Sequence, residues 1–166
     1  MPDGEPGSAL DTSSGEDSEM LYFAYADNMD EDTLSARGVK FEEVCTGKVR
    51  NLRLVFHKPA EDGAGRADLM DDRGSVVEGV VYDVPESSLD SLDVYEGVDK
   101  GHYRRQVVTV QTSRGELECI AYRAAKFRTG LKPRRDYLQA VIRGAEAHRL
   151  SPDYVIFLKS HVTMEG

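Results

Sequence analysis

The chain has 166 residues, of which 40% are hydrophobic and 31% charged, and this size and composition fit one folded domain with its own core. Its 21 Lys plus Arg stand against 30 Asp plus Glu, and the formal net charge of -9 repels phosphate backbones and anionic lipids from most directions. No apolar stretch reaches the roughly 20 residues of a membrane-spanning helix, and the N-terminus lacks a basic and apolar leader. We therefore expect a cytoplasmic protein whose partner is a small molecule, with no nucleic acid and no membrane.

The first residues differ in composition from the rest of the chain. Residues 1–19 hold six acidic residues and no basic one, among several Gly, Ser and Pro, and such a segment buries too little apolar surface to order itself. We predict a disordered acidic tail over residues 1–19 and a folded domain over residues 20–166. Cys45 and Cys119 lie in predicted strands without the spacing of a metal or redox site, so we expect two buried thiols and no metal.

The folded part begins with a strand, a tight loop and a helix. The apolar and aromatic run Leu21–Tyr25 predicts a buried strand. Asp27 or Asn28 can cap a short helix predicted over Met29–Ala36, and Gly38 ends it.

The remaining pattern mixes strands with helices. Val44–Phe56 alternates apolar and polar side chains imperfectly, as a bulged strand or a strand pair does, and residues 57–75 are predicted to be a polar loop. Periodicity, turn residues and prolines predict further strands over Val76–Val84, Tyr103–Thr112 and Glu116–Ala124, and helices over Pro85–Glu96, after Pro133 and from Ser151. These elements predict an α+β fold, a small mixed, closed or nearly closed β-barrel with peripheral helices.

Two features could carry chemistry. Glu96 lies in the final turn of a predicted helix, where the negative end of the helix dipole raises the pKa of a carboxyl and suits it to proton transfer. From position alone, a solvated glutamate beside Asp93 and Asp99 is the commoner outcome. The loop after the first strand offers free backbone N–H groups that can bind an anion, although most such helix starts bind only water.

Several segments resemble one known family. Tyr22–Met29 (Tyr-Phe-Ala-Tyr-Ala-Asp-Asn-Met) resembles the segment that opens gamma-glutamylcyclotransferases. Gly79–Tyr82, Leu89–Val98 and then Tyr103 resemble, in order and spacing, the family's strand, its helix with the catalytic Glu-Gly-Val, and the following tyrosine. The resemblance covers roughly Leu21 to Val162 and implies a small mixed barrel with outer helices, the gamma-glutamylcyclotransferase and gamma-glutamylamine cyclotransferase fold.

The resemblance also implies an activity and a set of site residues. Family members cyclise a gamma-glutamyl amide to 5-oxoproline and release an amine or amino acid without a cofactor, and Glu96 would be the general base and acid. Arg66 could bind a substrate carboxylate, although a solvated loop arginine is about twice as common. The other candidates for substrate binding are Tyr25, Ala26, Asp27, Asn28, Met29, Tyr103, Tyr122 and Tyr137, of which Tyr103 ranks first among the tyrosines because of its fixed distance from Glu96. No role is assigned to His57 or His102.

The loop departs from the family pattern at Ala26-Asp27, where the family has Gly-Ser. Ala resists a positive φ, and Asp27 adds a negative charge beside the carboxylate receptor. Either Asp27 turns away as a cap, or the site prefers a substrate with a cation, such as a gamma-glutamylamine, over a gamma-glutamyl amino acid. A non-catalytic module that binds a small ligand and a structural or interaction domain stay open as alternatives, as does a homodimer.

Overall fold

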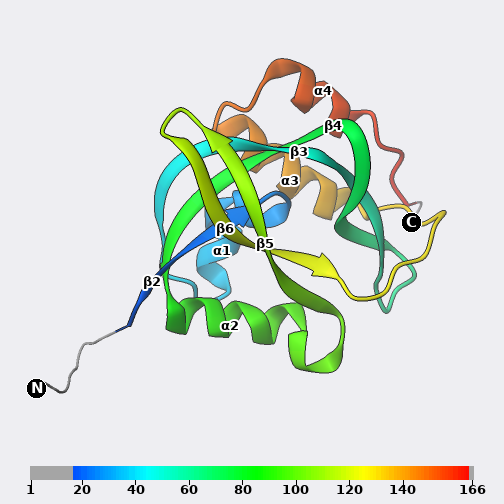
Figure 1. Cartoon of the computed structure of the whole chain (residues 1–166). Helices are drawn as coiled ribbons and strands as arrows, with labels where there is room; N and C mark the ends of the chain where they lie inside the picture. Colours follow the sequence, from blue (N-terminus) through cyan, green and yellow to red (C-terminus); the bar gives the residue numbers. More distant parts are fainter. Residues whose placement is uncertain (1–16, 165–166) are drawn as a thin grey trace, which may run out of the picture.

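The computed structural model describes residues 17–164, and within them five strands close into a barrel (Figure 1). The strands are β2 (Glu19–Ala24), β3 (Glu42–Pro59), β4 (Gly65–Pro85), β5 (Tyr103–Thr112) and β6 (Gly115–Ala124), in the order β2-β4-β3-β5-β6 around the barrel. Neighbours are antiparallel, except that β2 meets β6 in parallel at Tyr22 and Ile120. The α+β fold and the mixed, closed barrel predicted from the sequence are confirmed.

The prediction of a polar loop over residues 57–75 is wrong. β3 and β4 form one long antiparallel ribbon in which Pro59 lies opposite Gly65. Ala67 and Leu69 of this stretch are buried, as are the polar residues His57, Lys58 and Asp68, whereas Glu61, Asp62 and Arg73 are exposed. A Cβ at Gly65 would lie 2.2 Å from the carbonyl oxygen of Phe56. This glycine therefore permits a close approach of two backbones and does not mark a loop.

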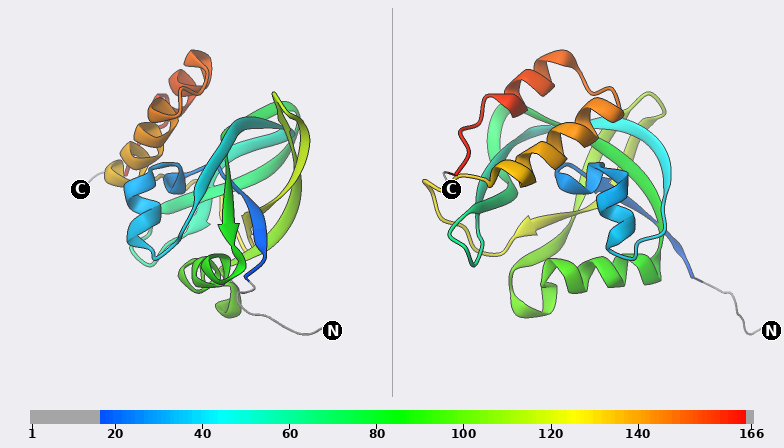
Figure 2. Two further views of the ribbon diagram at one scale, coloured as in Figure 1. Left: turned by 90° about the vertical axis from the view of Figure 1, so that its left-hand side faces the viewer. Right: turned by 180° about the vertical axis from the view of Figure 1, so that it is seen from behind.

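The helices lie outside the barrel (Figure 2). α2 (Glu86–Glu96) covers one end of it, and α3 (Arg135–Ala147) and α4 (Pro152–Lys159) lie along one side. Two short helices, η1 (Asp27–Met29) and α1 (Glu31–Ala36), follow β2, and η2 (Val98–Lys100) follows α2. No helix within residues 17–164 is long and apolar enough to span a membrane.

The start of α2 is held by residues that the sequence assigned to the tail. The Ser87 N–H donates to the Asp17 carboxylate at 2.9 Å, and the Glu86 N–H donates to the Ser18 carbonyl oxygen at 2.8 Å. Glu19 is the first residue of β2. The folded domain therefore includes residues 17–19, which corrects the predicted boundary, and the rest of the predicted tail, residues 1–16, lies outside the described residues.

The loop after β2 is positioned because η1 packs under α3. Met29 of η1 and Leu34 of α1 are fully buried, and burial of side chains of this size contributes about 1.5–3 kcal/mol each. A Cβ at Gly144 of α3 would lie 2.5 Å from the carbonyl carbon of Met29. Only glycine lets α3 approach the backbone of η1 this closely, and the loop that precedes η1 depends on this contact.

Candidate active site

A small enclosed cavity lies where β2 and α2 end. Its space for the centres of water-sized molecules is about 20 Å³, enough for about one or two waters. Its walls are formed by Tyr22, Tyr25, Ala26, Asp27, Asn28, Arg66, Ala67, Glu96, Tyr103, Tyr122 and Tyr137. Except for Met29, every candidate that the sequence indicated lies in these walls, so the barrel brings together residues from β2, η1, β4, α2, β5, β6 and α3.

Glu96 presents a carboxyl with a raised pKa to this cavity. α2 ends at Glu96 because Gly97 adopts a left-handed conformation with φ of 68°, and a Cβ at position 97 would lie 2.5 Å from the His102 ring. Burial, followed by the negative charge of Asp27, raises the pKa of Glu96 to about 7, against the opposing charges of Arg66, Arg37 and Lys58. A carboxyl with this pKa exchanges protons readily near neutral pH.

The backbone beside Glu96 offers three free donors. The N–H groups of Ala26, Asp27 and Asn28 donate no hydrogen bond to another part of residues 17–164, whereas the next N–H, that of Met29, donates to the Ala26 carbonyl oxygen at 3.1 Å. Ala26 has φ of -127° and ψ of -134°, so the positive φ that an alanine resists is not required. The loop therefore keeps the donors of an anion site without the family's Gly-Ser.

Met29 is a correction to the predicted site. Its side chain is fully buried in the core, its N–H is bonded within η1, and it does not line the cavity. Met29 supports the loop from below and has no group available to a substrate.

Asp27 is paired with a positively charged residue that the sequence did not indicate. Arg37, just after α1, donates to the Asp27 carboxylate at 2.7 Å and also to the side-chain oxygen of Asn28. Its guanidinium lies 3.9 Å from the centre of the Tyr95 ring. Asp27 caps no helix through its side chain. The charge that suggested a cation-bearing substrate is therefore already paired within the protein.

Arg66 belongs to β4 and lines the cavity, which corrects the expectation of a solvated loop arginine. Its guanidinium lies 4.9 Å from the centre of the Tyr137 ring, 3.9 Å from the Asp27 carboxylate and 3.1 Å from the Tyr95 hydroxyl, to which it donates. Its Nε is buried and has no partner among residues 17–164. Since an unbonded buried donor is costly, this nitrogen is available to an acceptor on a ligand.

The tyrosines of the cavity differ in whether their hydroxyl protons are free. Three hydroxyl protons are already bonded within the protein. Tyr25 donates to the Tyr122 carbonyl oxygen at 2.5 Å, Tyr103 donates to the Ala67 carbonyl oxygen at 2.7 Å, and Tyr122 donates to the Asp93 carboxylate at 2.5 Å. The Tyr137 hydroxyl instead accepts from the Ala67 N–H at 3.1 Å.

The Tyr22 hydroxyl, like that of Tyr137, acts as an acceptor within the protein: it accepts from the side-chain amide of Asn28 at 2.8 Å. Burial raises the pKa of both Tyr22 and Tyr137, which stay protonated at neutral pH. Tyr137 and Tyr22, ahead of the predicted first choice Tyr103, keep a proton to donate to a ligand.

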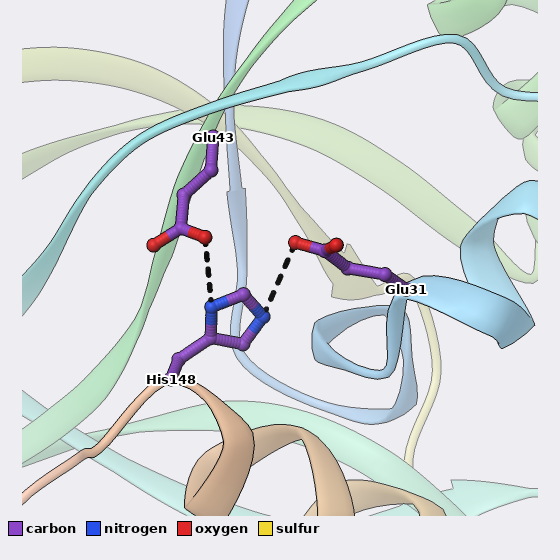
Figure 3. Close-up of side chains that lie close together, drawn as sticks. All are labelled: Glu31, Glu43 and His148. Atoms are coloured by element: carbon purple, nitrogen blue, oxygen red, sulfur yellow. Dashed lines mark ion pairs between the residues drawn. The ribbon is translucent and has the colours of Figure 1, made fainter.

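One cluster outside the cavity could in principle hold a metal ion. Figure 3 shows His148, at the end of α3, between the carboxylates of Glu31 and Glu43. Its Nδ1 lies 3.1 Å from Glu43, and its Nε2 lies 3.5 Å from Glu31 and 3.0 Å from the Met29 carbonyl oxygen. Because both ring nitrogens already have oxygen partners, we interpret the cluster as side-chain contacts that fasten α3 to α1 and β3.

The remaining groups of interest have structural surroundings. His57 pairs with Asp68 at 2.5 Å, and the other Asp68 oxygen accepts from the Ala124 N–H at 2.8 Å, which ties β3, β4 and β6 together. Cys119 is buried, Cys45 is partly buried, and both are free.

Comparisons with known proteins give the family. Residues 76–158, half of the chain, match the AIG2-like family. The chain is 32% identical to YkqA of Bacillus subtilis over 147 residues, 86% of this chain but 52% of that protein, so it spans about half the length of this relative. It is 28% identical to the gamma-glutamylcyclotransferase of Homo sapiens over 90% of this chain and 82% of the human protein. A solved gamma-glutamyl cyclotransferase matches with a TM-score of 0.84 and 26% identity over 90% of this chain and 91% of the other.

The fold and the site place the chain among small barrel proteins in which a glutamate at the end of a helix, here Glu96, lines a cavity. Within this class, the chain belongs to the AIG2-like, gamma-glutamylcyclotransferase-like family.

Proposed function

We propose that this protein cyclises a gamma-glutamyl amide to 5-oxoproline and releases an amine or amino acid. The observation that carries the proposal is the Glu96 carboxyl, whose pKa burial raises to about 7, in a cavity beside the free N–H groups of the loop after β2. The names of the bovine and human relatives, both gamma-glutamylcyclotransferases, support it. The two cysteines are free, as is usual in the reducing cytoplasm, and a cytoplasmic location is part of the proposal.

The nucleophile in this reaction belongs to the substrate. The alpha-amine attacks the side-chain carbonyl of the same glutamyl group, so one C–N bond forms in the five-membered ring and one C–N bond to the leaving nitrogen breaks. Neither water nor an oxidant is consumed. Holding the amine over the carbonyl uses the large effective molarity of intramolecular reactions, which reaches about 7–11 kcal/mol in well-oriented cases.

Glu96 moves the protons in this scheme. Its ionised carboxylate takes one proton from the attacking ammonium, and the resulting acid gives it to the leaving nitrogen. The second proton, which the ring nitrogen loses as the lactam forms, follows the same route, so the amine leaves as an ammonium ion and the enzyme ends in its starting state. A pKa of about 7 keeps both forms populated at neutral pH. Such a role contributes about 10²- to 10⁴-fold in rate.

The other walls bind the negative charges. We assign the free N–H groups of Ala26, Asp27 and Asn28, together with the buried Nε of Arg66, to the alpha-carboxylate of the substrate. The Tyr137 hydroxyl would donate to the carbonyl oxygen as it gains charge. Because the closed cavity holds only about one or two waters, a glutamyl group must move a wall side chain to enter. Arg66 and Tyr137, which also line the open groove outside, are the walls that we expect to move.

The experiment follows both products in water labelled with heavy oxygen. With a gamma-glutamyl amino acid as substrate, we expect 5-oxoproline and the free amino acid in equal amounts, and no label in the 5-oxoproline. Labelled glutamate would show hydrolysis instead of cyclisation, and binding without any product would show a non-catalytic module. Either result would contradict the proposal.

A further inference from the structure

A second, open groove adjoins the enclosed cavity. It has a volume of about 630 Å³ and shares Arg66 and Tyr137 with the cavity as walls. Its other walls come from the end of β3 and the connection to β4, from the segment before β5 and from the start of α3. An amide whose glutamyl part occupies the cavity could extend its leaving group past these two shared walls into the groove.

Lys58 is the unusual residue of this groove. The residue as a whole is 9% exposed. Its ammonium has no ion-pair partner among residues 17–164. The ammonium lies 3.3 Å from His102 Nδ1 and 5.6 Å from the centre of the Tyr103 ring. A partly buried ammonium is stabilised further by an opposite charge or by more hydrogen bonds. Lys58 therefore offers a charge-assisted hydrogen bond to an anionic group that enters the groove.

The other charges of the groove do not supply the missing partner. Asp62 pairs with Arg134 at 3.2 Å, and Glu61 is exposed on the connection between β3 and β4. Burial, followed by the positive charge of Arg66, lowers the pKa of Lys58, and the negative charge of Glu96 opposes this. Lys58 therefore interacts with the charge of Glu96, the residue whose protonated form would donate to the leaving nitrogen.

We propose that this groove is the leaving-group subsite and that Lys58 is a specificity-determining residue that selects leaving groups bearing a carboxylate. The proposal rests on the proposed function. In a gamma-glutamyl amino acid, the carboxylate of the leaving group is two bonds from the leaving nitrogen, whereas a gamma-glutamylamine has no anion at this position. The Asp27 carboxylate that had favoured an amine is already paired with Arg37 at 2.7 Å, and Lys58 adds a positive charge that favours an acid.

A matched pair of substrates tests the proposal. Gamma-glutamylalanine and gamma-glutamylalaninamide have the same shape but differ in the charge of the leaving group. We expect Lys58→Gln to lower kcat/KM for gamma-glutamylalanine by about 10- to 100-fold, as the loss of a hydrogen bond to a charged group does. The amide substrate should change by less than about 3-fold, since it loses only a neutral hydrogen bond.

Two further variants separate this role from a structural one. Lys58→Arg keeps the charge and should retain most of the preference for the acid. Lys48→Gln removes an exposed lysine from the same strand and should leave both substrates unchanged. An unchanged ratio of kcat/KM between the two substrates in Lys58→Gln, or an equal loss on both, would overturn the role of Lys58 alone. A wild-type protein that forms no 5-oxoproline from either substrate would overturn the proposed function, and this inference with it.

Discussion

Gly144 gives a prediction in which two physical effects have opposite signs. Replacing a helical glycine by alanine stabilises an exposed helix by about 1 kcal/mol. In this protein, however, the added Cβ would lie 2.5 Å from the Met29 carbonyl carbon and 2.6 Å from the Asp30 nitrogen. Both are backbone atoms, which cannot rotate away as a side chain does, so α3 must separate from η1. Overpacking of this kind costs about 1–3 kcal/mol. After the gain in helix propensity is subtracted, we expect Gly144→Ala to destabilise the protein by up to about 2 kcal/mol.

Thermal unfolding measures this effect. A loss of about 2 kcal/mol lowers Tm by about 4–8 °C for a domain of this size. Gln139→Ala, at an exposed position of the same helix, is the control and should change Tm little. Because η1 follows the loop that carries the free N–H groups, Gly144→Ala should also raise KM for the substrate. A raised Tm would refute the close approach of α3 and η1.

Three more predictions concern the charges and hydroxyls around the site. The plot of kcat/KM against pH should fall about tenfold per unit below about pH 7, because the general base Glu96 is then protonated; a curve that stays flat down to pH 5 would argue against this role. Tyr137→Phe should lower kcat by about 10- to 100-fold. The hydroxyl proton of Tyr103 is already bonded to the Ala67 carbonyl oxygen, so Tyr103→Phe should lower stability more than kcat. Equal kcat for the two variants would contradict the assignment. His148→Gln should cost about 1–3 kcal/mol in unfolding by urea, since it removes the contacts of the imidazole with two glutamates. An unchanged midpoint would show that the cluster contributes nothing.

The fold could be predicted largely because local patterns and one resemblance agreed. The apolar run of β2, the Gly97 end of α2 and the hairpin of β5 and β6 are all encoded by neighbouring residues. The ribbon of β3 and β4 was missed over residues 57–75 because its polar residues and glycines have the composition of a loop, although His57, Lys58 and Asp68 are buried in the ribbon. The anchoring of α2 by Asp17 was missed because its partner, Ser87, is distant in the sequence.

The site was predicted unevenly for a similar reason. Glu96 and the loop after β2 stand in recognisable segments, so they could be named from the sequence. Arg37, which pairs with Asp27, and Lys58, which lacks an acidic partner, gain their meaning only from residues that the barrel brings beside them. No spacing rule connects such residues, since their partners lie on other elements and their charges are unremarkable in the sequence.

The direct test of the central claim, that one enclosed carboxyl transfers the protons, compares Glu96→Gln with Glu86→Gln, a change at an exposed position of the same helix. Formation of 5-oxoproline should fall by about 10²- to 10⁴-fold in Glu96→Gln and should be unchanged in Glu86→Gln. The folded chain binds a proton at Glu96 between pH 4.5 and about 7 that the unfolded chain has released, so stability falls as pH rises through this window. Glu96→Gln should therefore be up to about 3 kcal/mol more stable than the wild type at pH 8 and equally stable at pH 4. Normal turnover by Glu96→Gln would contradict the account.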